Sequence, residues 1–120
     1  MAFEDRETYS PLFIFEHENK LGNYSLLLTD QHMVGAIGEL FETAGRQSSG
    51  YTWADVALQA MRSSSPELEE RLSMDPEAGM FCAYGEDLEA IKALGALLHT
   101  AYHDRSALAE LVRNAPYEYD

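Results

Sequence analysis

Residues 71–87 read RLSMDPEAGMFCAYGED and carry the clearest β-hairpin signal in the chain. Within the central DPEAG segment, aspartate can bond back to the backbone, proline fixes φ, and glycine supplies a residue with positive φ. Residues 71–75 and 80–84 are therefore predicted to be the two strands of an antiparallel hairpin. Glu86 and Asp87 follow the second strand and are expected to open the longest helix of the chain.

A second hairpin is expected near the beginning of the sequence. Residues 11–17 and 23–30 are short runs rich in aromatic and branched side chains, and the turn-forming stretch between them contains Gly22. The leucines at positions 26–28 form a continuous apolar run rather than an alternating one. Continuity of this kind is typical of a central strand that is partly covered on both faces, and we expect such a strand here.

Helical spacing of apolar residues fills the chain between the two hairpins. Thr29 or Asp30 is expected to cap a first helix, which ends at Gly45 in the left-handed conformation that closes many helices. The next start signal is more complete, because Thr52 can cap a second helix and Asp55, three residues on, can return the hydrogen bond. A serine-rich stretch ends this second helix, and a short turn of helix is expected before the second hairpin.

Two further helices are expected after the second hairpin, and Asp104 caps the last one. The order of elements is therefore ββααββαα. We predict an α+β fold in which about four strands from two hairpins form an antiparallel sheet, with the helices packed on one face. The 120 residues are expected to form a single domain, residues 1–120, without an internal disulfide, because Cys82 is the single cysteine.

The charge balance restricts the classes of partner. The chain has 21 Asp and Glu against 8 Lys and Arg, a formal net charge of -13. Nucleic acids and anionic membrane surfaces are bound by cations, so neither is expected as a partner. A basic protein is the natural complement, since long-range attraction raises the rate of encounter. The alternative is that the acidity only keeps the protein in solution.

The beginning of the sequence bears on location. Acidic residues at positions 4, 5 and 7 precede any apolar run, whereas a secretory signal needs a basic start followed by a continuous apolar stretch. No segment reaches the length of a membrane-spanning helix. We therefore expect a cytoplasmic protein.

Residues that could carry catalysis or bind a cofactor are sparse. His99 and His103 have the spacing of a metal-binding pair on one face of a helix, but no third ligand accompanies them. Cys82 lies in the middle of a predicted strand among apolar neighbours, which favours a buried structural thiol over a nucleophile. Nucleotide-binding loops and catalytic triads are not recognisable. We predict that the protein is not an enzyme and binds neither a metal nor a cofactor.

The segment from Gly35 to Gly38 matches the GXXG string of a nucleic-acid-binding KH loop. It lies inside a helical pattern and has no Lys or Arg beside it. Close packing of helices is the better explanation of these two glycines.

Aromatic and acidic residues suggest a surface for a protein partner. Tyr and Trp beside carboxylates are typical anchors for a basic partner, although Trp53 and Phe81 are equally typical of a hydrophobic core. Acids at the hairpin tip and at helix starts are expected to be exposed. The predicted partner-binding residues are Tyr51, Trp53, Asp55, Asp75, Glu77, Glu86 and Asp87.

Two segments carry a resemblance to a known family. The stretch GYTW at residues 50–53, followed by a helix, and the stretch DPEAGMFCAY at residues 75–84, followed by an acid-capped helix, resemble the immunity protein 51 family. The resemblance extends from about Phe13 to Arg113, and the terminal residues 117–120 depart from it. It implies a small α+β protein, encoded beside a bacterial polymorphic toxin, that neutralises the toxin by direct binding without catalysis or cofactor.

Three hypotheses for function follow. In the first, the chain is an immunity protein that binds and neutralises a cognate bacterial toxin, with a basic, nuclease-type toxin domain as partner. In the second, it is an acidic regulatory adaptor or enzyme inhibitor that acts by protein–protein binding. In the third, it is a metal-dependent enzyme that uses His99 and His103. The resemblance and the charge of -13 favour the first hypothesis.

Overall fold

The strands form one antiparallel sheet with the order β1-β2-β3-β5-β4 in the computed structural model, which describes residues 2–120. Their bounds are Glu4–Asp5 (β1), Phe13–Glu16 (β2), Tyr24–Thr29 (β3), Ser73–Met74 (β4) and Met80–Gly85 (β5). Both predicted hairpins are confirmed, because β2 pairs with β3 and β4 pairs with β5. The sheet has one strand more than expected, since β1 adds to the outer edge of β2.

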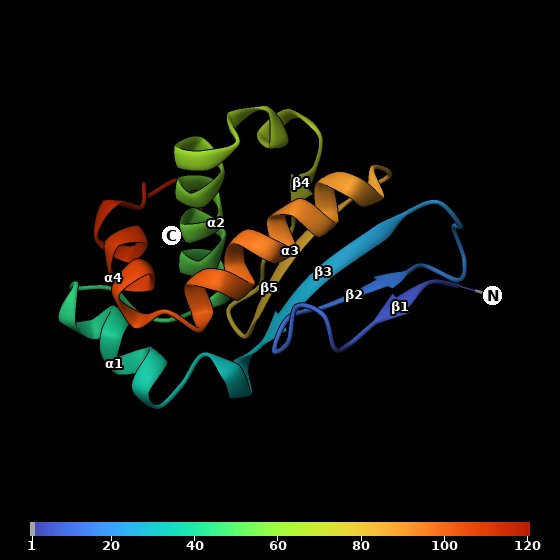
Figure 1. Ribbon diagram of the computed structural model, residues 1–120. Coiled ribbons are helices and arrows are strands. Elements are labelled where there is room, and N and C mark those ends of the chain that lie inside the picture. The colour runs from blue at the N-terminus through green and yellow to red at the C-terminus, as the bar shows by residue number, and fades with distance from the viewer. Residues whose placement is uncertain (1) are drawn as a thin grey trace.

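Four α-helices accompany the sheet, which confirms the predicted α+β fold. They span Ala36–Thr43 (α1), Gly50–Ser64 (α2), Leu88–Tyr102 (α3) and Arg105–Asn114 (α4), and two short 3-10 turns span Asp30–His32 (η1) and Pro66–Glu70 (η2). Helices α2 and α3 lie against one face of the sheet, α4 packs beside both, and α1 lies next to α4 (Figure 1). None of the helices formed by residues 2–120 combines the length and apolar character needed to cross a bilayer.

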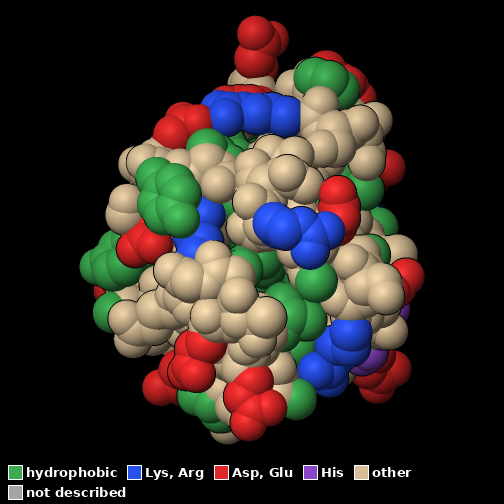
Figure 2. Space-filling view, turned by 90° about the vertical axis from the view of Figure 1, so that its left-hand side faces the viewer, with side chains coloured by type: hydrophobic (Ala, Val, Ile, Leu, Met, Phe, Trp, Pro, Cys, Tyr) green, Lys and Arg blue, Asp and Glu red, His purple; other side chains and the backbone are tan. Residues whose placement is uncertain are grey.

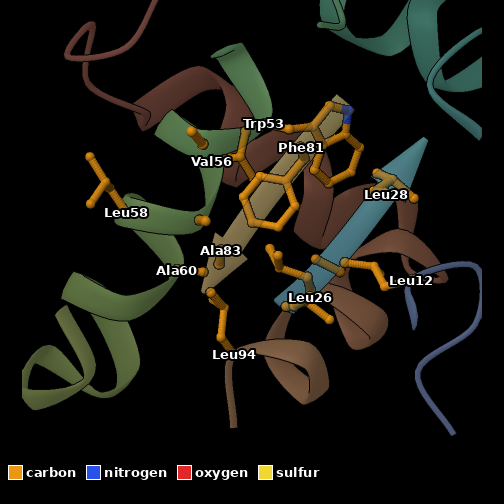
Figure 3. Close-up of a cluster of buried hydrophobic side chains, with 14 of the residues drawn as sticks. Leu12, Leu26, Leu28, Trp53, Val56, Leu58, Ala60, Phe81, Ala83 and Leu94 are labelled. Atoms are coloured by element: carbon orange, nitrogen blue, oxygen red, sulfur yellow. The ribbon is translucent and has the colours of Figure 1, made fainter. Parts of the chain in front are cut away.

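The core lies between the sheet and helices α2 and α3. Alternate residues of β3 and β5 point toward these helices, so that Leu26 and Phe81 meet Trp53 of α2 and Leu94 of α3 (Figure 3). All four of these side chains are fully buried. The ring of Trp53 lies 5.2 Å from that of Phe41, which joins α1 to the same core.

Two of the predicted helix caps are confirmed by hydrogen bonds. The carboxylate of Asp87 accepts from the backbone N–H of Ala90 at 3.1 Å, at the start of α3. The carboxylate of Asp104 accepts from Ala107 at 3.2 Å, at the start of α4. Each bond satisfies an amide that has no partner within its own helix, so both caps fix where the helices begin.

The first predicted helix is interrupted. A 3-10 turn, Asp30–His32, replaces its first part, and α1 begins only after Gly35, whose φ of 67° is favourable for glycine alone. The close-packing explanation of the two glycines was wrong, because a Cβ added at Gly35 would meet nothing within 4 Å and one at Gly38 would make only an ordinary contact at 3.5 Å. Gly45 does adopt the predicted left-handed conformation, with φ of 77°.

The start of α2 lies three residues earlier than predicted. Ser49, not Thr52, is the cap, and its hydroxyl accepts from the N–H of Thr52 at 3.3 Å. The N–H of Gly50 donates to the carbonyl of Ala78 at 3.0 Å, so the helix start rests on the tip of the β4–β5 hairpin. A Cβ at Gly50 would lie 1.9 Å from the carbonyl oxygen of Glu77, and only glycine permits this approach.

Candidate protein-binding surface

Two of the predicted partner-binding residues lie in the interior. Trp53 belongs to the core, and its indole N–H donates to the hydroxyl of Ser48 at 3.1 Å. Asp55 is 0% exposed, and one of its carboxylate oxygens lies 3.0 Å from the guanidinium of Arg46, which is itself buried. Neither Trp53 nor Asp55 reaches the surface, so neither is available for contact with a partner.

Asp55 anchors the end of the chain instead. Its carboxylate accepts the backbone N–H groups of Glu118, Tyr119 and Asp120 at 3.1, 2.9 and 3.1 Å. Arg46 completes the arrangement by donating to the carbonyls of residues 115 and 116, both at 3.1 Å. The terminal residues, which depart from the family resemblance, are therefore fixed against α2 by hydrogen bonds. The signal for this in the sequence was Asp55, an acid among the apolar residues of that helix.

The end of the molecule that carries α4 and the C-terminus has its cations largely paired. Arg62 bonds Glu69 at 2.8 Å and Glu118 at 2.6 Å, and Arg113 pairs with Glu110. Figure 2 views this end and shows Lys and Arg side chains lying next to Asp and Glu side chains. Much of the positive charge of the chain is thus compensated locally, by carboxylates of the same molecule.

The hairpin tip has carboxylates without such compensation. Asp75 and Glu77 are exposed on the hairpin, Tyr51 is 39% exposed beside it at the start of α2, and Asp30 lies against Gly79. Within residues 2–120, none of these three acids takes part in an ion pair. The start of α2, which carries Tyr51, therefore lies beside the hairpin tip, since the N–H of Gly50 donates to the carbonyl of Ala78 at 3.0 Å.

Glu86 and Asp87 lie elsewhere, at the opposite end of β5 from the hairpin tip. Asp87 accepts from the guanidinium of Arg71 at 2.8 Å in addition to capping α3. This guanidinium, and then the amide of Ala90, hold the pKa of the Asp87 carboxyl below its ordinary value. Asp87 thus joins the segment before β4 to the start of α3, whereas Glu86 is exposed.

One face of the sheet has no helix on it. We call it the open sheet face and define it by the outward residues of the three longest strands, which are Phe13, Phe15, Ser25, Leu27, Thr29, Met80, Cys82 and Tyr84. All four helices of residues 2–120 lie on the other side (Figure 1). The run at 26–28 lies in a central strand, as expected, since β3 lies between β2 and β5. Helices cover Leu26 and Leu28, whereas Leu27 points outward between Phe13 and Cys82 and is partly buried there.

The outward side chains pack against one another along β2. The rings of Phe13 and Phe15 stack with centroids 6.4 Å apart, and the guanidinium of Arg6 lies 4.2 Å from the Phe13 ring. His17 extends the row, since its ring lies 5.0 Å from Phe15 and its Nε2 lies 2.7 Å from the Ser25 hydroxyl. The result is an ordered aromatic surface rather than a set of separate exposed side chains.

The acids of the hairpin adjoin this face. The N–H of Asp75 donates to the carbonyl of Cys82 at 3.0 Å, and Glu77 pairs with Met80 in an isolated bridge, so both acids continue the outward rows. Burial raises the pKa of the Cys82 thiol to about 11, and the nearby carboxylates of Asp75 and Glu77 add to this rise. A thiol with so high a pKa is a poor nucleophile at neutral pH, in agreement with the structural role expected for Cys82.

The histidine pair is engaged in a local contact. His99 Nδ1 and His103 Nε2 lie 2.9 and 2.8 Å from the same oxygen, the backbone carbonyl of Ser10. A carbonyl oxygen only accepts, so both ring nitrogens donate, and the pair fastens the segment before β2 to the end of α3. Among residues 2–120, no group of three His, Cys, Asp or Glu side chains is placed to hold a metal ion.

Comparison with models of known protein families gives a match over residues 12–116, to the family described as Immunity protein 51. The chain belongs to the immunity protein 51 family. No curated protein and no solved structure matches the chain. The resemblance seen in the GYTW and DPEAGMFCAY segments is thereby confirmed, and its extent agrees with the range expected from the sequence.

The candidate surfaces of this immunity protein 51 member lie inside the matched region, and other features lie outside it. The open sheet face and the hairpin tip lie inside residues 12–116, whereas β1 and residues 117–120 lie outside. A second candidate surface also lies inside it, a groove of about 460 Å³ between α2, α3 and α4. Leu97, Ala101 and Leu111 form its apolar wall. The chain thus offers two surfaces, one flat with acids at its edge and one concave.

Proposed function

We propose that the chain neutralises a bacterial toxin domain by binding it directly, without catalysis. The match to the immunity protein 51 family over residues 12–116 is the observation that carries this proposal. The fold agrees with such a role, since an antiparallel sheet with helices on one face leaves a rigid opposite face for contact with another protein.

The proposed partner is basic and of the nuclease type. The net charge of -13 attracts a cationic protein over a long range and raises the rate of encounter. Nuclease domains bind phosphates through Lys and Arg, and a surface of that kind also accepts carboxylates. The exposed acids at the hairpin tip, which form no ion pair within residues 2–120, are available for such contacts.

The proposed place of action is the cytoplasm of the toxin-producing cell and its kin. A nuclease-type toxin finds its substrate there, so the protein that blocks it is needed in the same compartment. The single cysteine, Cys82, is consistent with a reducing environment.

Co-expression with the toxin domain encoded beside the gene tests the proposal. We expect cells that carry both proteins to survive, and the two purified proteins to elute as one complex in gel filtration at low salt. The same toxin domain expressed with an unrelated acidic protein of similar size is the control, and those cells should die. Death of the cells that carry this chain, together with separate elution of the two proteins, contradicts the proposal.

A further inference from the structure

The open sheet face is apolar where water-facing sheet surfaces are ordinarily polar. An antiparallel sheet with helices on one side usually alternates between apolar inward residues and polar outward residues. Here β2, β3 and β5 each place apolar residues on both sides, and the outward ones are not part of the core cluster. The helices within residues 2–120 lie on the other side of the sheet, and on this face Ser25 and Cys82 are buried while Tyr84 is exposed.

Part of this face remains accessible, although Ser25 and Cys82 are buried among the neighbouring side chains. Tyr84 of β5 is 41% exposed. Leu27 of β3 and, beyond it, Phe13 and Phe15 of β2 are partly exposed on the same face. A contiguous apolar surface of this kind is characteristic of protein–protein contacts. Its aromatic members are also the residue types that contribute most to the affinity of such contacts.

The two edges of the open sheet face differ in charge. On the β1 edge, Glu4 is neutralised by Arg6, whose Nε lies 2.8 Å from the Glu4 carboxylate. On the β4–β5 edge, Asp75 and Glu77 form no ion pair with any residue of the described chain. A partner that covers this face therefore gains most if its Lys or Arg residues lie opposite the β4–β5 edge.

A second copy of the chain does not fit this requirement. Each copy has a net charge of -13, and two copies that met on this face would bring four acids of the β4–β5 edges into a repelling assembly. A basic protein with an apolar patch meets both the apolar centre and the acidic edge.

We propose that the open sheet face is the surface on which the toxin domain docks. In this arrangement an apolar patch of the toxin domain covers Phe13, Leu27 and Tyr84, and its cationic residues bind Asp75 and Glu77. This inference rests on the proposed function and adds to it the contact surface and the orientation of the partner.

Affinity measurements with paired variants test the surface. The probe is the toxin domain encoded beside the gene, inactivated by substitution in its own active site, and its affinity is measured by titration calorimetry. The variant Phe13→Ala/Tyr84→Ala shortens two side chains of the open sheet face, and Leu97→Ala/Leu111→Ala shortens two of the helical groove. We expect the first to bind at least about 100-fold more weakly and the second to bind within about threefold of wild type.

Charge reversal gives a second test that does not depend on the apolar substitutions being tolerated. Asp75→Lys/Glu77→Lys reverses the acids of the β4–β5 edge, and Glu39→Lys/Glu42→Lys reverses two exposed acids of α1 with the same change in net charge. We expect the first variant to associate with the toxin domain about tenfold more slowly than the second at low salt. Urea unfolding of all four variants confirms that they are folded.

The outcomes separate this inference from the proposed function. Loss of binding in both open-face variants, with both controls unaffected, supports the inference. Wild-type affinity in the open-face variants, or loss of binding in the groove variant alone, overturns the inference and leaves the proposed function standing. Failure of the wild-type chain to bind the toxin domain overturns both, and a wild-type dimer that Phe13→Ala/Tyr84→Ala dissociates assigns the face to a second copy instead.

Discussion

At the scale of single residues, the Arg46–Asp55 pair fixes the position of the C-terminal residues. Both side chains are buried, and together they bind the carbonyls of Ala115 and Pro116 and the three N–H groups that follow Tyr117. Burying an ion pair is costly in itself, so its value depends on every remaining polar group being satisfied. The tail supplies most of those groups, although Arg46 Nε has no hydrogen-bond partner within residues 2–120. These hydrogen bonds hold the C-terminal residues in place.

Replacing Asp55 with asparagine is expected to lower the free energy of unfolding by about 3–5 kcal/mol, because Arg46 then stays buried with only the half-exposed carboxylate of Asp120 as counter-charge. The asparagine amide also turns a donor toward groups that need an acceptor. Urea unfolding at neutral pH measures the loss. Asp120→Asn, which changes only the half-exposed partner of Arg46, is the control and should cost much less. Equal losses in the two variants would contradict the anchoring role of Asp55.

The sequence predicted the aromatic and acidic candidates as one group, and the structure divides them. Asp75 and Glu77 are exposed, as expected from the hairpin turn, and Tyr51 is exposed at the start of α2. Trp53 faces the core, whereas Asp55 lies on the same face of α2 as Tyr51 and is buried by the C-terminal residues. Helical periodicity alone could not separate Asp55 from Tyr51, because the segment that covers Asp55 is distant in the sequence.

At the scale of elements, the sequence predicted those strands and helices whose ends are fixed by hydrogen bonds between residues close in the chain. The DPEAG hairpin and the helices that start after Asp87 and Asp104 depend on hydrogen bonds within a few residues, and all were found from the sequence. The start of α2 has a local cap, Ser49, in place of the predicted Thr52, and also a contact between Gly50 and Ala78, which are far apart in the chain. No pattern of neighbouring residues contains that contact.

Alanine substitutions at Gly50 and at Gly38 are expected to have opposite effects on the free energy of unfolding. In Gly50→Ala the new Cβ would lie 1.9 Å from the Glu77 carbonyl oxygen and 2.1 Å from that of Met80, so the hairpin and α2 must separate. We expect a loss of about 3 kcal/mol in the free energy of unfolding. In Gly38→Ala, inside α1, the Cβ has room and should raise stability by about 0.5–1 kcal/mol. Thermal and urea unfolding measure both, and a neutral Gly50→Ala would contradict the docking of α2 on the hairpin.

Strand β1 shows a second element that local patterns missed. It is held by the side chain of Glu16, whose carboxylate accepts the N–H of Phe3 at 3.0 Å and that of Gly22 at 2.7 Å. One carboxylate thus joins the segment before β1 to the turn between β2 and β3. A two-residue strand that pairs with the edge of β2 has no alternating pattern of its own to recognise.

The same carboxylate predicts a dependence of stability on pH. The amide of Phe3, and then that of Gly22, lower the pKa of Glu16 below its ordinary value of 4.5. Its contribution is therefore complete above that value and is lost as the pH falls through the lowered pKa of the folded state. We expect Glu16→Gln to be less stable than wild type near about pH 6, with the difference closing toward about pH 2. Urea unfolding across this range measures it, and a constant difference would contradict the assignment.

At the scale of the whole molecule, the helical side and the sheet side have different roles. The helices cover the core and hold many of the paired cations, whereas the open sheet face presents apolar residues with unpaired acids at one edge. The sequence contained a signal for this face, since β2, β3 and β5 are each apolar at consecutive positions while the predicted helices could cover only one side of the sheet. The continuous leucine run was interpreted as coverage within the chain, because the sequence of one molecule does not display its partner.

Titration of the activity of the toxin domain with the purified chain tests the central claim most directly. The account predicts that activity falls in proportion to the chain added and disappears at equal molar amounts, with no other component present. It also predicts that more chain is needed at high salt, since the attraction between an acidic protein of net charge -13 and a basic one is screened. Full toxin activity in the presence of a large molar excess of the chain at low salt would contradict the account.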